Sequence, residues 1–217
     1  MPKQQNKPTQ AIEILKKFWT GEEFAIFNKF DPWRILVSGI ISHRTNDNVT
    51  FPATERIMEK WPTAFDLAKA SPDEVASTIF PAGFYNKKGI RLVEIAKEIV
   101  DLGNVPKTID ELLKIKGIGR KTANLILSLG FQIPSIVVDT HVHRISNRTG
   151  WVKTSTPEET EYELMSLLPK NLWTISNELL VRLGQNICRP IRPLCSKCPI
   201  KNPCKVVLGQ AGFVVDI

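Results

Sequence analysis

The sequence predicts an all-α protein, on three observations. Hydroxyl side chains suited to helix N-caps recur at Ser71, Thr108 and Thr156, each followed by a carboxylate three residues later, an arrangement that satisfies the free amides of a first helical turn. Beyond these positions apolar residues recur at helical spacing, and the sustained alternation typical of half-buried strands is missing. Short segments rich in glycine and proline lie between the helical patterns, so many short connections are expected.

Length and composition indicate an ordinary folded protein. The chain has 217 residues, of which 42% are hydrophobic and 24% charged, which favours a sizeable core over a disordered or fibrous chain. Its apolar stretches fall short of the roughly 18 residues that cross a bilayer. The first eight residues are basic and lack an apolar stretch, so a short tail is expected there rather than a secretion signal.

The distribution of charge favours an anionic partner. The net charge is +7, and the cations gather in two stretches of the second half. Residues 112–157 hold seven Lys or Arg and a single acid, while residues 179–215 hold six and no acid. Such stretches are typical of a surface that faces phosphates, although a face that is basic by chance has the same composition.

A helix, the turn Gly117-Ile118-Gly119 and a second helix that opens with Arg120 are predicted next. Glycines let the backbone turn tightly and approach a phosphate, and the free amides at the start of the second helix point at that phosphate. Ile118 is expected to anchor the turn by burying its side chain. The same pattern also fits simple packing of two helices around a glycine turn.

Two residues of the basic region are candidates for chemistry. Lys121 follows Arg120 at a helix N-terminus, where both the helix and the arginine favour the neutral, nucleophilic amine; contact with a phosphate is the alternative role. Asp139 ends the apolar run 136–138 and is predicted to cap the next helix. A carboxylate held in a basic region also suits stabilisation of a developing positive charge, and one residue can do both.

All four cysteines fall within seventeen residues, with the spacing C-x6-C-x2-C-x5-C. Their crowding favours a metal site over disulfides, and spacing alone fits zinc and an iron-sulfur cluster equally. Arg189 and Arg192 lie in the first loop, which a metal would stiffen into a phosphate contact. The four candidate ligands are Cys188, Cys195, Cys198 and Cys204.

The hairpin, the segment Val138-Asp139-Thr140-His141 and the cysteine spacing, in this order, resemble the endonuclease III family of helix-hairpin-helix DNA glycosylases. The resemblance runs from about Trp33 to Cys204. It implies one 4Fe-4S cluster on the four cysteines, attack of Lys121 on C1′ of the damaged nucleoside, and assistance from Asp139. The resulting Schiff base permits β-elimination of the 3′ phosphate.

The resemblance also implies the architecture and the partner. Two helical domains are expected to flank a DNA-binding cleft: a central bundle over residues 26–134 with the hairpin, and a terminal domain made of 1–25 and 135–217 with the cluster loop 188–204. The expected partner is double-stranded DNA with damaged bases or abasic sites, bound by a monomer in the nucleoid of a prokaryotic cytoplasm. The target base has to leave the stack to reach Lys121.

Further DNA contacts follow from the resemblance. Phe84 replaces the leucine of the family's wedge loop and is expected to intercalate, with Lys87 and Lys88 on the DNA backbone; a core aromatic is the alternative. Arg44 stands where the family often has glutamine, and suits a guanine edge or a structural role. Asp47 matches the family and is expected to be structural.

The resemblance implies a bifunctional glycosylase and lyase for oxidised pyrimidines. A monofunctional mismatch glycosylase for adenine or thymine is the alternative enzyme. Lys121 speaks against it, as does Gly39 at the position where adenine-specific relatives carry a catalytic glutamate. A non-catalytic, metal-stabilised DNA-binding module is the alternative from another class, in which Lys121 and Asp139 would have no chemical role.

Overall fold

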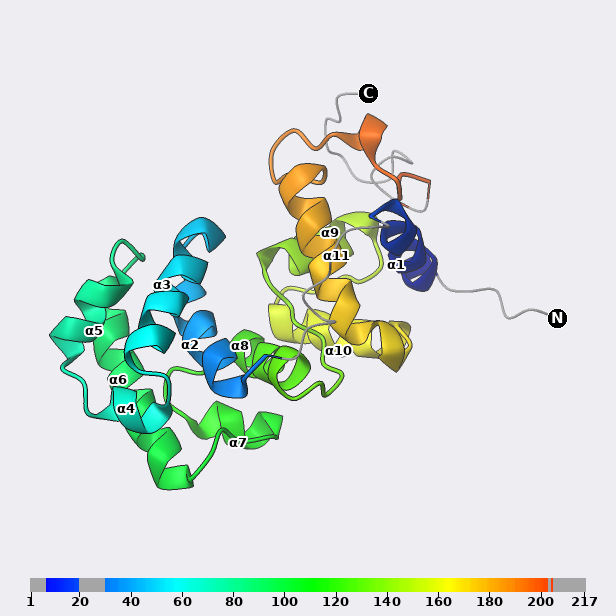
Figure 1. The fold of residues 1–217 in the computed structure, drawn as a ribbon. Helices are drawn as coiled ribbons and strands as arrows, with labels where there is room; N and C mark the ends of the chain where they lie inside the picture. The colour runs from blue at the N-terminus through cyan, green and yellow to red at the C-terminus, as the bar shows by residue number, and fades with distance from the viewer. Residues whose placement is uncertain (1–6, 20–29, 203, 205–217) are drawn as a thin grey trace. The chain divides into compact units, whose positions relative to one another are not determined.

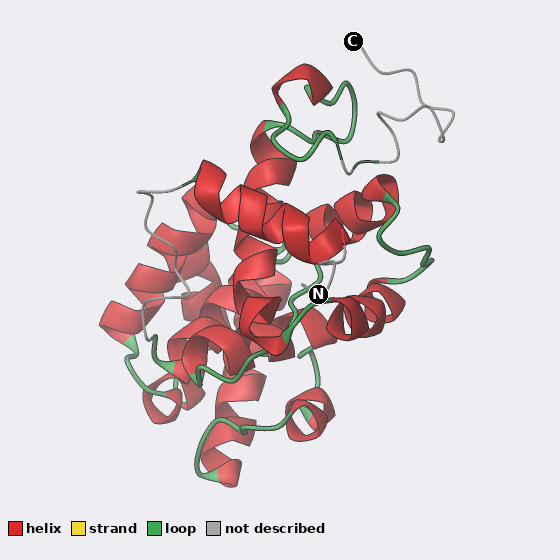
Figure 2. Ribbon diagram, turned by 90° about the vertical axis from the view of Figure 1, so that its right-hand side faces the viewer, coloured by secondary structure: helices red, strands yellow, loops and turns green. Residues whose placement is uncertain are grey.

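The computed structural model describes residues 7–19, 30–202 and 204, and every regular element in these ranges is a helix (Figure 2). The prediction of an all-α protein is therefore confirmed. The chain divides into two compact units, one of residues 29–133 and the other of residues 1–28 and 134–217. In the described part of the chain no helix is long and apolar enough to span a membrane.

The unit of residues 29–133 is built around the apolar helix α2, which packs against α3, α6 and α8. Helices α4 and α5 also pack against α6, and α5 contacts α3 as well (Figure 1). One buried apolar cluster joins these helices and includes Ile118 of the glycine turn. The elements are α2 (Pro32–Ser42), α3 (Asp47–Lys60), α4 (Ala64–Ala68), α5 (Pro72–Ile79), α6 (Tyr85–Leu102), α7 (Ile109–Lys114), α8 (Arg120–Leu125) and the π-helix η2 (Ile126–Gly130).

The other unit has its own core, in which α11 packs against α1 and α9, and α9 against α10. The buried segment 135–138 leads directly into α9. After α11 the chain continues into the loop that carries the cysteines. The elements are α1 (Lys7–Phe18), α9 (Thr140–Thr149), α10 (Pro157–Leu167), the 3-10 turn η3 (Lys170–Leu172), α11 (Trp173–Asn186) and the 3-10 turn η4 (Cys195–Lys197).

The three predicted capping residues all precede helices, but they cap in different ways. Thr156 forms the full reciprocal capping box with Glu159. Thr108 accepts from the Glu111 amide, and its hydroxyl also bonds the Glu111 carboxylate. Ser71 makes no side-chain cap bond; the proline that follows it fixes the backbone of the first turn, so this helix starts without the hydroxyl.

Candidate functional site

The glycine turn between α7 and α8 has the form that the sequence predicts. Gly117 has a φ of +98°, a conformation that favours glycine, and a Cβ there would come within 2.6 Å of the Arg91 side chain, which would have to shift. Ile118 is 5% exposed and packs in the core, which confirms that it anchors the turn. Its side chain is therefore turned away from solvent, and only its backbone is available to a ligand.

Gly119 caps α8 under different constraints. Its φ is an ordinary −94°, and a Cβ there would meet no protein atom within 4 Å. Nothing inside the described protein therefore requires glycine at this position. A ligand that has to approach the backbone closely, such as a phosphate in front of the α8 amides, does require it.

Lys121 is the second residue of α8 and is half-buried. The next residue, Thr122, is buried, and its Oγ1 lies 3.2 Å from Nε2 of His43. Burial lowers the pKa of His43, and the positive charges of Lys121 and then Lys88 lower it further. His43 therefore lies within electrostatic reach of Lys121, and no pattern in the sequence indicated that the two are neighbours.

Gly39 lies on α2 against the start of α8. A Cβ at this position would come within 2.8 Å of the Thr122 methyl group. Since Thr122 is itself buried, a glutamate at position 39 would need this contact to shift. The packing next to Lys121 is thus built for a residue without a side chain.

Arg44 and Phe84 project together from two adjacent loops. The Arg44 guanidinium lies 5.7 Å from the centre of the Phe84 ring, within the range of a cation-π contact. Phe84 is 56% exposed, so it is not a core aromatic, and Arg44 is exposed as well. Lys87 is exposed in the first turn of α6, and Asp47 opens α3 in its first turn.

The expectation that Lys88 meets the DNA backbone is wrong. Lys88 is 7% exposed, and its ammonium donates to the backbone oxygens of Ile41 and His43 and to the Thr45 hydroxyl. It is the fourth residue of α6, and the helix turns it inward while Lys87 faces out. Nothing in the sequence around Lys87 and Lys88 indicated that one would be exposed and the other buried.

Asp139 caps α9, as its position predicts. Its Oδ1 accepts from the Val142 amide at 2.8 Å, and the residue is half-buried. The segment before it is fixed by burial and by Asn177 of α11, whose Nδ2 donates to the Val137 carbonyl at 2.9 Å. The carboxylate therefore has a defined position at the end of a rigid segment.

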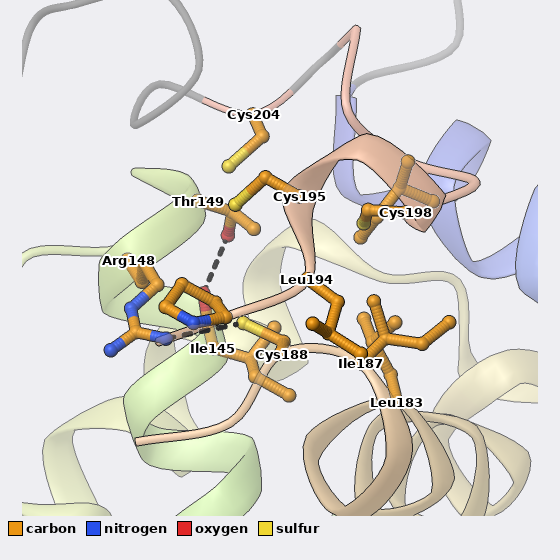
Figure 3. Close-up of a pocket in the computed structure, with 12 residues that line it drawn as sticks. Ile145, Arg148, Thr149, Leu183, Ile187, Cys188, Leu194, Cys195, Cys198 and Cys204 are labelled. Atoms are coloured by element: carbon orange, nitrogen blue, oxygen red, sulfur yellow. Dashed lines mark hydrogen bonds between the residues drawn. The ribbon is translucent and has the colours of Figure 1, made fainter. Parts of the chain in front are cut away.

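The four cysteines line one pocket between α9, α11 and the loop after α11 (Figure 3). All four are free thiols. In Figure 3 Cys195 and Cys204 are drawn close together, whereas Cys188 lies below them and Cys198 to the right. As the side chains lie, no group of three or more metal-ligand residues in the described ranges has a metal-binding geometry. The rest of the lining is mainly apolar, with Ile145, Leu183, Ile187, Leu194 and Ile200.

The thiol chemistry of this pocket suits a metal centre. Burial raises the pKa of Cys198 to about 11, and the charges of the other three cysteines add to the rise. Burial likewise raises the pKa of Cys195, with Cys188 and Cys204 contributing. Four ionised thiolates in this pocket thus oppose one another, and a bound cationic centre would reverse that balance.

Two arginines of the basic stretch are turned to the cysteine loop rather than to a ligand. Arg148 donates to the carbonyls of Arg189 and Pro190 at 2.7 and 3.0 Å, and to the Cys188 sulfur at 3.5 Å. Arg144 donates to the Cys188 carbonyl at 2.9 Å. The i,i+4 spacing of the two arginines on α9 could have indicated a shared partner, since it places both side chains on one face of the helix.

Arg189 and Arg192 are both exposed in the loop between Cys188 and Cys195. Arg192 has a φ of +51°, which a bulky residue adopts only when its surroundings impose it. Between them Ile191 is 81% exposed. This loop therefore presents two cations and an apolar side chain to solvent, while its backbone is held by Arg148.

Comparison with known proteins gives consistent results at the level of sequence. The model of the HhH-GPD superfamily of base excision DNA repair proteins matches residues 37–170. Endonuclease III of Thermotoga maritima is 46% identical over 197 residues, which are 90% of this chain and 90% of that protein. Endonuclease III of Synechocystis is 31% identical over 207 residues, 94% of either chain. The similarity therefore spans whole proteins rather than single motifs.

Solved structures show the same similarity in three dimensions. A trapped endonuclease III–DNA covalent intermediate matches with a TM-score of 0.84 and 29% identity, over 93% of this chain and 95% of that one. A thermostable thymine-DNA glycosylase matches with a TM-score of 0.81 over 94% and 97% of the two chains, at 24% identity. At that lower identity the likeness concerns the fold alone.

Proposed function

Because this chain belongs to the endonuclease III family, within the HhH-GPD superfamily of base excision DNA repair proteins, we propose that it excises oxidised pyrimidines and cleaves the abasic site that remains. The substrate is double-stranded DNA with a damaged base or an abasic site. The protein acts as a monomer on the nucleoid DNA of a prokaryotic cell. Its net charge of +7 supports this choice of partner.

The observation that carries the lyase activity is the primary amine of Lys121 in the first turn of α8. The neutral amine attacks C1′ of the damaged nucleoside, and the electron pair of the breaking glycosidic bond leaves with the base. The attacking nitrogen then loses one proton, and its lone pair displaces O4′ from C1′, so the sugar ring opens, O4′ takes up a proton and a protonated Schiff base forms. This Schiff base acidifies the protons at C2′. Loss of one of these protons breaks the bond from C3′ to the phosphate oxygen by β-elimination, and the strand is cut.

Asp139 assists departure of the base. As the bond from C1′ to the base breaks, positive charge develops on the sugar, and a fixed carboxylate stabilises it. The cap bond to Val142 and the buried segment before Asp139 support this role, because they hold the carboxylate in place before the substrate arrives. One carboxylate thereby serves the helix and the reaction.

The protein binds the DNA through its phosphates and recognises the damaged position with side chains that enter the duplex. The amides of Gly119 and Arg120 and the backbone of Gly117 and Ile118 face a phosphate, and Gly119 leaves room for it. Phe84 fills the space that the extruded nucleotide leaves, and Arg44 faces the unpaired base. Three exposed cations, Lys87, Arg189 and Arg192, contact phosphates.

Cys188, Cys195, Cys198 and Cys204 hold one 4Fe-4S cluster. The cluster supplies thiolate-bound iron that stabilises the fold of the loop, as metal centres do where a short segment lacks a core. The all-thiol donor set and the apolar lining of the pocket support this assignment. Arg148 and Arg144 fix the backbone of the loop from α9.

Protein purified without oxygen is expected to be yellow-brown and to contain about four iron atoms per chain. Iron and sulfide analysis together with the visible absorption spectrum measures this directly. Iron should be lost when Cys195 is replaced by Ala, whereas Ser196→Ala, beside it in the same turn, should keep the metal. A colourless protein loaded with zinc would contradict the cluster.

Excision from a panel of duplexes tests the proposed activity. Oxidised pyrimidines are expected to be removed fastest, with strand cleavage coupled to excision, because the amine that displaces the base also forms the Schiff base. Removal of adenine or thymine from mismatches without a strand break would instead support the monofunctional alternative. Binding to all duplexes without any excision would leave only the DNA-binding module.

A further inference from the structure

Lys88 is a buried cation that the proposed mechanism does not use. Its Nζ lies 2.6 Å from the Ile41 oxygen, 2.6 Å from the His43 oxygen and 2.8 Å from the Thr45 hydroxyl. An ammonium group has three donors, so all three are satisfied. None of the three acceptors is a carboxylate, which is the usual partner of a buried lysine.

Burying this charge among neutral acceptors has a cost. Burial lowers the pKa of Lys88 from 10.5 to about 8, which means that the surroundings disfavour the charged form. A methionine or leucine would fill the same space without that penalty. The presence of a lysine at this buried position is therefore explained by the backbone and hydroxyl groups that its ammonium holds in place.

Lys88 holds the end of α2. Ile41 belongs to the last turn of that helix, and His43 is its C-cap residue. Their carbonyl oxygens lie at the negative end of the helix, where a cation is favourable. The ammonium thereby defines the path of the chain just before Arg44.

The same contacts tie this loop to the one before α6. The Thr45 hydroxyl oxygen accepts one hydrogen bond from the Lys88 ammonium and another, at 3.1 Å, from the Gly83 amide. A Cβ on Gly83 would come within 2.6 Å of the Arg44 carbonyl oxygen. Arg44 and Phe84 thus extend from two loops that touch through their backbones and share one hydrogen-bonded centre.

Both projecting residues have a strained backbone. Arg44 has a φ of +51° and Phe84 a φ of +58°, a region that bulky residues rarely enter. Such conformations persist only where the surrounding contacts impose them, and they are common at functional sites. The hydrogen bonds of Lys88 and Thr45 are among the contacts that fix the backbone next to this pair.

We propose that Lys88 is a positioning residue for lesion recognition, whose ammonium holds Arg44 and Phe84 as one unit that enters the duplex. This role rests on the proposed repair function, and it explains how Arg44 and Phe84 are kept at the spacing that the function requires. Phe84 stacks in the void and Arg44 meets the unpaired base only if the two loops keep their spacing. Lys88 itself does not touch the DNA.

The test compares duplex with single-stranded DNA, because a single strand has no opposite base and no void to fill. Each substrate carries one abasic site, and the rate of strand cleavage is measured on both. Lys88→Met removes the ammonium and keeps an apolar side chain of similar length. It is expected to lower the duplex-to-single-strand rate ratio about tenfold, a typical coupling between contacting residues.

Lys97→Met is the matched control. Lys97 is an exposed lysine of the same helix, so it loses the same charge without any contact to the two loops, and the ratio should stay at the wild-type value. An unchanged ratio in folded Lys88→Met would overturn the inference and leave the proposed function intact. Wild-type protein that cleaves neither substrate would overturn the proposed function itself.

Thr45→Val provides a second route if Lys88→Met does not fold. It removes the hydroxyl that joins Lys88 to the Gly83 amide, and it should lower the same ratio about threefold or more. In a chain that already carries Arg44→Ala and Phe84→Ala, either variant should change the ratio less than about twofold. A full additional loss in that background would assign Lys88 a purely structural role.

Discussion

Lys121→Gln is expected to abolish the covalent adduct that borohydride traps between the wild-type protein and abasic DNA. Borohydride reduces a Schiff base to a stable amine, so trapping reports the nucleophile directly. Glutamine has a similar length but no amine that can attack C1′. Strand cleavage should fall by roughly a thousandfold or more, as is typical when a nucleophile is removed.

Lys116→Gln is the control for this experiment. Lys116 is an exposed lysine of the same hairpin, just before Gly117, so its loss weakens the charge of the region without removing the amine at 121. Gel analysis of the borohydride-treated complex should show the adduct undiminished in this variant. An adduct that survives Lys121→Gln would show that another amine is the nucleophile.

Asp139→Asn should separate the two roles of this residue. Asparagine caps helices as well as aspartate does, and its side-chain oxygen can still accept from the Val142 amide. Folding and DNA binding should therefore persist, while base excision falls about 10²- to 10⁴-fold because the fixed negative charge is gone. Single-turnover excision rates, binding affinity and thermal unfolding measure the three properties separately.

Asp139→Ala completes this comparison. It removes both the charge and the cap, so its excision rate should match that of Asp139→Asn while its free energy of unfolding falls by about 1 kcal/mol. If Asp139→Asn excises bases at the wild-type rate, the carboxylate caps α9 and has no part in the chemistry.

The spacing of the four cysteines predicts a metal site but not the identity of the metal. The interval C-x6-C-x2-C-x5-C indicates a metal site but by itself fits zinc and iron equally. The expectation of iron came from reading the cysteines together with the hairpin and the segment around Asp139. Spacing also said nothing of Arg144 and Arg148. They count as phosphate-facing cations in the sequence, yet the structure turns both to the backbone of this loop.

Local patterns in the sequence determined much of this protein. The all-α class and the cap formed by Asp139 depend on contacts a few residues apart, such as the bond from the Val142 amide to Asp139. The left-handed backbone of Gly117 is likewise a local property. Residue type and short spacing are sufficient to specify contacts of this kind. The same patterns singled out Lys121, because its place at a helix start is also a local property.

The tertiary structure alone decided which side chains face solvent and which face the interior. Lys87 and Lys88 are neighbours of one type, yet Lys87 is exposed and Lys88 bonds atoms more than forty positions away in the chain. The pairing of Arg44 with Phe84 likewise joins distant segments. Contacts of this kind depend on how helices pack, and a local sequence pattern does not encode packing between distant elements.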